Sequence, residues 1–122
     1  MRGLNKVILI GRLGKNPEVR ESQSGSSKWS SFSLATNRGV RRGEQWEEET
    51  DWHRVTCFGA LAEQCGSFLQ KGALVAVEGS VQNDNWTTEE GQRRFATTII
   101  AEGVTFLESA STVMDRSDHL EA

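Results

Sequence analysis

The sequence of 122 residues contains no tyrosine, only one proline and only two cysteines. No uninterrupted apolar run approaches the roughly 20 residues that a membrane-spanning helix needs. Residues 1–14 contain basic residues near their start and a short apolar run, but they lack the apolar length and the cleavage site of a secretory signal peptide. We therefore expect a cytoplasmic protein.

The few cysteines and histidines argue against catalysis and metal binding. Cys57 and Cys65 form no CxxC motif, and His53 and His119 are distant along the chain, so a zinc site is not expected. Two small buried thiols are the simpler interpretation. His53 and Cys57 would stand about 13 Å apart on one strand, too far for a nucleophile and its base. The glycines at 11 and 14 are not followed by the Gly-Lys-Ser/Thr of a phosphate-binding loop. We predict a protein that is not an enzyme and uses no cofactor.

The net charge of −3 gives little reason to expect a nucleic-acid ligand, but the charges are unevenly distributed along the chain. Residues 1–42 carry nine Lys/Arg and two acids, whereas residues 43–122 carry five Lys/Arg and fifteen acids. A basic surface can therefore coexist with an acidic one. If the first strands line one groove, the early basic residues form a phosphate-binding track; otherwise they are a scattered solvated surface. These residues are Arg2, Lys6, Arg12, Lys15, Arg38, Arg41 and Arg42.

Short β-type runs separated by glycines predict an all-β domain over residues 1–108, with a short flexible tail over residues 109–122. An apolar stripe predicts one helix over residues 60–70, ended by Gly72. Five strands with a helix between the third and fourth is the order of an OB-fold barrel, although a small sandwich fits the strand count nearly as well. The strands are expected at residues 4–13, 29–37, 52–58, 74–81 and 94–107, with a short extended segment at 18–21.

Three segments carry further structural expectations. Residues 7–10 are apolar on both faces, which is typical of a strand buried on two sides. Gly11 and Gly14 suit a bend in that strand. The polar segments 38–51 and 85–94 are expected to be exposed hairpin loops.

The segment WHRVTCF is the most informative about ligands. Side chains alternate along a strand, so Trp52, Arg54, Thr56 and Phe58 share the face opposite the apolar one. Every base has a flat π-face, so such a surface binds unpaired nucleic acid without reading sequence, at roughly 1–3 kcal/mol per stacked base. The interleaved arginine can bind phosphate or stack on a base. The alternative is that the two aromatic residues belong to the core.

The other tryptophans differ in their surroundings. Trp86 lies in the polar segment NDNWTTEEGQRR, which is unusual for a core residue, and Arg93 and Arg94 would flank it across the turn. Trp46 is surrounded by five acids that repel phosphate, so a DNA-binding role is doubtful and packing on the loop or on another subunit is the alternative. Trp29 begins a strand and is interpreted as structural.

Five stretches are together highly specific: RGLNKVILIGRLGKNPEVR, FSLATN, TDWHRVTCFGALAE, FLQKGALVAVEG and NWTTEEGQRRFATTIIAE. Over residues 2–107 the chain resembles the bacterial single-stranded DNA-binding protein family. The resemblance implies an OB-fold that assembles as a homotetramer, wraps single-stranded DNA, and acts in replication, recombination and repair near the nucleoid.

The resemblance also assigns roles to individual residues. Trp52, Phe58 and Trp86 match the base-stacking aromatic residues of the family. The histidine at its subunit interface corresponds to His53. The phosphate-contacting positions correspond to Arg2, Lys6, Arg54 and Lys71.

Several departures from the family argue against tight or extensive wrapping of DNA and lead us to expect a weaker electrostatic grip. Val40 replaces a tryptophan, Ala60 replaces a lysine, and residues 83–85 replace basic residues. The sequence ends in DRSDHLEA, without the family's acidic tip, so tail-mediated recruitment of replication and repair proteins is not supported. The alternative hypotheses are a primosome-type OB-fold accessory protein that acts through protein contacts, and an RNA-binding module of the cold-shock kind.

Overall fold

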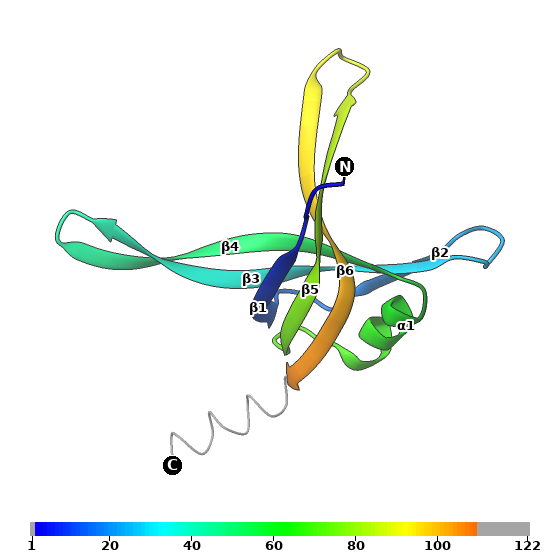
Figure 1. Cartoon of the computed structure of the whole chain (residues 1–122), viewed down its shortest axis with the longest axis horizontal. Helices are drawn as coiled ribbons and strands as arrows, with labels where there is room; N and C mark the ends of the chain where they lie inside the picture. Colours follow the sequence, from blue (N-terminus) through cyan, green and yellow to red (C-terminus); the bar gives the residue numbers. More distant parts are fainter. Residues whose placement is uncertain (1, 110–122) are drawn as a thin grey trace.

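The computed structural model describes residues 2–109, which form mostly strands and one helix (Figure 1). Of the expected flexible tail, residues 110–122 lie outside the described residues. Within residues 2–109, no helix is long and apolar enough to cross a membrane, and no cluster of three His, Cys, Asp or Glu side chains could hold a metal ion. The elements are β1 (Val7–Leu13), β2 (Glu18–Glu21), β3 (Lys28–Arg42), β4 (Gln45–Phe58), α1 (Gly59–Phe68), β5 (Leu74–Thr87) and β6 (Arg93–Glu108).

Five of the strands close into a barrel. Their order is β1-β5-β6-β4-β3, and β3 pairs again with β1. The short β2 pairs with the start of β3 along the same edge that β1 uses, because β4 occupies the other edge. All neighbours are antiparallel except β4 and β6. Because α1 follows the third barrel strand and precedes the fourth, the predicted OB-fold order is confirmed.

Closure of the barrel depends on a close approach between β1 and β3. The last two residues of β1 pair with Leu34 and Ala35 of β3, while most of β1 pairs with β5. At Gly11 a Cβ atom would overlap the backbone carbonyl oxygen of Ala35. The glycine expected to bend this strand therefore makes room for a neighbouring backbone.

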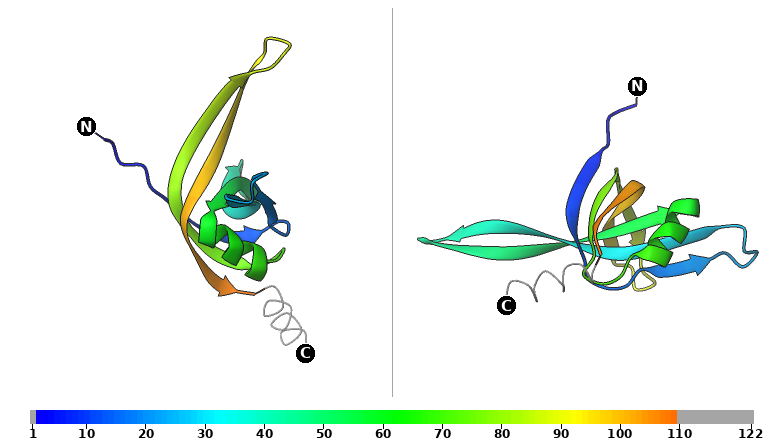
Figure 2. Two further views of the ribbon diagram at one scale, coloured as in Figure 1. Left: turned by 90° about the vertical axis from the view of Figure 1, so that its right-hand side faces the viewer. Right: turned by 90° about the horizontal axis from the view of Figure 1, so that it is seen from below.

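The core lies between the barrel strands and α1, which covers one end of the barrel (Figure 2). Cys57 of β4 and Cys65 of α1 are fully buried with their Sγ atoms 3.8 Å apart, so the prediction of two buried free thiols is confirmed. The hydrogen bond with Cys57, together with burial, raises the pKa of the Cys65 thiol. The buried hydrophobic residues are Leu13, Phe32, Leu34, Val55, Cys57, Ala62, Cys65, Leu69, Ala73, Val75, Val77, Ile99 and Ala101.

The helix is shorter than predicted. It ends at Phe68 rather than at residue 70, and Leu69 already has extended backbone angles. The Phe68 side chain is 69% exposed and its ring lies 6.2 Å from that of Phe106, so it does not belong to the buried stripe. At Gly66 a Cβ atom would overlap the side chain of Val19, which explains a glycine inside the helix.

The first strand differs from the prediction in length and in burial. It begins at Val7 rather than at residue 4, because before Val7 the Asn5 side chain, and not the backbone, bonds to the neighbouring strand β5. The Asn5 side chain donates to the carbonyl of Val81 at 2.7 Å and accepts from its N–H at 2.9 Å. Ile8 and Ile10 are 65% and 59% exposed, so the expectation of a strand buried on both faces is wrong for the single chain.

The two segments expected as loops are mostly strand, which corrects the prediction. β3 and β4 stay paired out to a turn at residues 43–44, and β5 and β6 stay paired out to Thr87 and Arg93. The two ribbons leave the barrel in different directions (Figure 1). The charges do not prevent strand formation because they pair across the strands: Arg38 binds Glu49 and Asp51, and Arg42 binds Glu47 and Glu49.

Candidate nucleic-acid interface

The outer faces of β3, β4, β6 and β5 form one surface, here called the outer sheet face. Directly opposite residues of paired strands point to the same side. Val55 and Ile99 are partners in the core, so their neighbours Arg54 and Thr98 are partners on the outer sheet face. Further along β6, Arg94 pairs with Trp86 on the same side. The register therefore places Trp52, Phe58 and Trp86 on one continuous face.

The three aromatic residues are all accessible. Trp52, Phe58 and Trp86 are 60%, 56% and 50% exposed, whereas Val55 and Cys57 on the inner side of β4 are fully buried. These values exclude the interpretation of Trp52 and Phe58 as core residues. Each ring has a free surface on which a planar group can stack.

Trp52 lies on this face beside Gly14 and Lys15. Its ring covers Gly14, where a Cβ atom would overlap the indole carbons. Directly opposite Trp52 is the small side chain of Ala35. A shallow hollow of about 250 Å³ is lined by Trp52, Gly14, Lys15 and Ser33. The second glycine singled out in the sequence thus makes room for the indole ring.

Lys15 lies between Trp52 and Arg54, because it lines a hollow beside each of them. Besides lining the hollow at Trp52, it lines a second one of about 270 Å³ together with Asn16 and Arg54. The Lys71 backbone N–H donates to Asn16 Oδ1 at 2.8 Å, which places Lys71 at the rim of the same region. The sequence alone gives no reason to single out Lys15 from the other early basic residues, because it is far from Trp52 along the chain.

Phe58 and Trp86 have different neighbours on this face. Phe58 ends β4 and lies directly opposite Trp29, which is half-buried. Trp86 lies directly opposite Arg94, whereas Arg93 pairs with Thr87 on the other face. Arg93 instead lies over the ring of Phe95, 5.9 Å from its centroid. Of the two arginines expected to flank Trp86, only Arg94 shares its face.

Ion pairing divides the ten basic residues predicted to contact phosphate. Lys6 is bound to Glu78, whose hydrogen bond and charge raise the pKa of that lysine. Arg12 binds Glu108 at 3.1 Å, and Arg38 and Arg42 bind carboxylates of β4. Within residues 2–109 the other six have no ion pair: Arg2, Arg41, Arg54, Lys71, Arg93 and Arg94. A paired cation has to give up a carboxylate to bind phosphate, so the unpaired ones are better placed.

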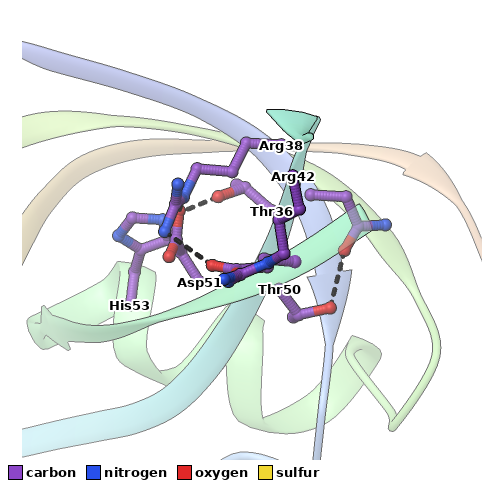
Figure 3. Close-up of polar contacts among 8 residues, drawn as sticks. Thr36, Arg38, Arg42, Thr50, Asp51 and His53 are labelled. Carbon is purple, nitrogen blue, oxygen red and sulfur yellow. Dashed lines mark hydrogen bonds and ion pairs between the residues drawn. The ribbon is translucent and has the colours of Figure 1, made fainter. Parts of the chain in front are cut away.

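The β3–β4 ribbon separates its charges by face. The ion pairs of Arg38 and Arg42 lie on the side opposite Trp52, where His53 Nε2 is 2.8 Å from Thr36 Oγ1 (Figure 3). On the side of Trp52, Thr50 Oγ1 donates to Asn37 Oδ1 at 2.9 Å. Most acids of β4 are therefore turned away from the outer sheet face. His53 projects from the face of β4 opposite to that of Trp52, as strand alternation predicts.

Comparison with known proteins agrees with this geometry. The sequence profile described as "Single-strand binding protein family" matches residues 4–107. A curated protein of Xylella fastidiosa (strain Temecula1), named "Single-stranded DNA-binding protein", is 42% identical over 108 residues, or 87% of this chain. The chain spans 65% of the length of that relative. The solved structure "Plasmodium falciparum SSB complex with ssDNA" is similar with a TM-score of 0.78 and 33% identity, over 88% of this chain and 98% of that one.

Proposed function

This chain belongs to the single-strand binding protein family, and we propose that it binds and protects single-stranded DNA on the outer sheet face without strict sequence preference. The observation that carries the proposal is the set of three half-exposed aromatic residues on one face, Trp52, Phe58 and Trp86. Their rings can stack on unpaired bases of any kind. In a duplex the same base faces are hidden by stacking.

The phosphate backbone requires cations beside these rings. Arg54 and Lys15 line the hollows next to Trp52, and Arg94 stands across from Trp86. None of the three has an ion pair within residues 2–109, so each can bind phosphate without first losing a carboxylate. Arg2, Arg41, Lys71 and Arg93 are further unpaired candidates. Lys6, Arg12, Arg38 and Arg42 would have to exchange partners.

The proposed role is binding without chemical change of the DNA. Single strands are exposed during replication, recombination and repair, and we place the protein there, in the cytoplasm with the nucleoid. The names of the Xylella fastidiosa relative and the Plasmodium falciparum complex support this role.

Titration with oligo-dT tests the proposal. Bases stacking on Trp52 and Trp86 should quench tryptophan fluorescence, and the logarithm of the affinity should fall with the logarithm of the salt concentration by about 0.7 per phosphate neutralised. Absence of quenching at low salt would exclude the proposed function. A preference for oligo-U over oligo-dT would favour the RNA-binding hypothesis. Weak binding to oligo-dT together with capture of a helicase loader would favour the hypothesis of an accessory protein that acts through protein contacts.

We further propose that the protein is a homotetramer. The exposed side chains of Ile8 and Ile10 on β1 support a contact between protomers. Within residues 2–109, β1 pairs on its second edge only at Arg12 and Leu13, so the first part of that edge is open to a second copy. The half-buried His53 is a second candidate contact, on the ribbon side opposite Trp52.

Assembly is tested by light scattering on two variants. His53→Tyr removes the hydrogen bond with Thr36 and adds bulk, so the mass should shift toward the monomer at low protein concentration. Ile8→Glu should do the same because it places a charge in an apolar contact. Leu4→Glu is the control, since Leu4 is 94% exposed and precedes the strand. A tetramer that persists in both test variants would refute these contacts.

A further inference from the structure

The β3–β4 ribbon carries a tryptophan that the proposed DNA surface does not include. Trp46 lies near the tip of the ribbon and is 71% exposed, more than Trp52 or Trp86. β3 and β4 pair without a break in register from the Arg42–Gln45 pair to the Trp29–Phe58 pair. Trp46 and Trp52 are six positions apart on β4, an even number, so both side chains project from the same face of the ribbon.

Two neighbours position the Trp46 ring. It lies across Gly39, where a Cβ atom would stand 3.5 Å from the indole carbons. Arg41 is the residue directly opposite Trp46. Its Nε donates to the carbonyl of Gly43 at 3.1 Å, and it has no ion pair within residues 2–109. The tip of this ribbon therefore presents an exposed indole beside a cation that is free to bind phosphate.

The same arrangement occurs on the other ribbon. On β5 and β6, Trp86 lies directly opposite Arg94. Both ribbons thus carry a tryptophan–arginine pair across their strands. An arginine beside a stacking ring suits a nucleotide, because the ring takes the base and the guanidinium takes the phosphate.

The acids around Trp46 in the sequence do not surround it in space. Glu47 and Glu49 project from the opposite face, where Arg42 and Arg38 bind them. Glu48 shares the face of Trp46, and Glu44 lies in the turn. Arg41 offsets Glu48, so this side of the ribbon lacks the concentrated negative charge that the sequence suggests.

We propose that Trp46 is a further base-stacking position, with Arg41 as its phosphate contact, and that it extends the DNA path from Trp52 along the ribbon. This rests on the proposed function and adds a dependence on length. Six residues of extended strand cover about 20 Å, so only a sufficiently long single strand can contact Trp52 and Trp46 together.

Two oligonucleotide lengths test this position. We expect Trp46→Ala to bind an oligo-dT of about 16 nucleotides roughly 5- to 150-fold more weakly than the wild type, but one of about 5 nucleotides equally well. Val40→Ala is the matched control because Val40 lies on the opposite face of the ribbon; it should bind both like the wild type. For the longer oligonucleotide, Arg41→Gln should reduce the slope of log affinity against log salt concentration by about 0.7, which corresponds to one phosphate contact.

A second measurement observes the ring itself. In a Trp29→Phe/Trp52→Phe/Trp86→Phe background, Trp46 is the one tryptophan left in the sequence, so the longer oligo-dT should quench its fluorescence and the shorter one should not. If the wild type binds but Trp46→Ala binds the longer oligonucleotide as tightly, Trp46 is not a stacking position and the proposed function stands. A reduced native mass of Trp46→Ala would place the ring in a subunit contact and would also overturn the proposal. If the wild type binds neither oligonucleotide, the proposed function itself fails.

Discussion

Trp52→Ala is expected to weaken the binding of oligo-dT by about 5- to 150-fold, the equivalent of one lost base stack of roughly 1–3 kcal/mol per site. The ring is 60% exposed above Gly14 and beside Lys15, so its loss removes a binding surface without opening the core. The native mass should not change. Fluorescence anisotropy with a labelled oligonucleotide measures the affinity, and light scattering measures the mass.

Two controls accompany this variant. Trp52→Phe keeps an aromatic ring and should retain most of the affinity. Phe68→Ala removes a side chain of similar exposure, 69%, that packs against Phe106 beside the helix and away from the outer sheet face. It should bind oligo-dT like the wild type. Equal binding by Trp52→Ala and Phe68→Ala would contradict a special role for Trp52.

Leu34→Ala is expected to lower the free energy of unfolding by about 2–5 kcal/mol, the range for truncation of a buried leucine. Leu34 is fully buried and lies directly opposite His53, beneath the sheet that carries Trp52. Urea unfolding at a fixed protein concentration measures the change, since assembly also contributes to stability.

The same truncation at an exposed site is the control for Leu34. Leu4 is 94% exposed, and Leu4→Ala should change the free energy of unfolding by no more than about 0.5 kcal/mol. If the two variants unfolded at the same urea concentration, the described core would be wrong. The comparison separates the barrel core from the exposed apolar residues that surround it.

Local alternation explains why part of the site could be predicted. In WHRVTCF the inner residues Val55 and Cys57 are fully buried and the outer residues Trp52 and Phe58 are more than half exposed, as the period of two requires. The burial of both thiols was predicted, whereas their contact with each other was not. The order of the elements favoured a barrel with one helix, and the pairing of β1 with β3 decides between this barrel and the small sandwich that the strand count also allowed.

The ribbons could not be predicted from local sequence. Charged runs such as residues 41–49 have weak strand propensity, and their strands form because Arg38 and Arg42 meet acids of the neighbouring strand. The same pairing decides which acids face Trp46. The register describes how two strands are aligned with each other, so it cannot be read from the sequence of one segment alone.

The exposed side of β1 was missed for a related reason. The run from Val7 to Ile10 is apolar throughout, and within a single chain only one side of it reaches the core. Lys15 was likewise not separated from the other early basic residues, because its position beside Trp52 and Arg54 depends on how β1 crosses β3. Both features depend on tertiary or quaternary contacts.

The most direct test of DNA binding by the outer sheet face is NMR of the tryptophan indole N–H groups during titration with oligo-dT at low salt. The four tryptophans supply four side-chain signals, which single Trp→Phe substitutions assign. We expect the signals of Trp52 and Trp86 to shift until the site is saturated. If both signals stayed unmoved while the oligonucleotide was bound, the DNA would lie elsewhere and the proposed interface would be wrong.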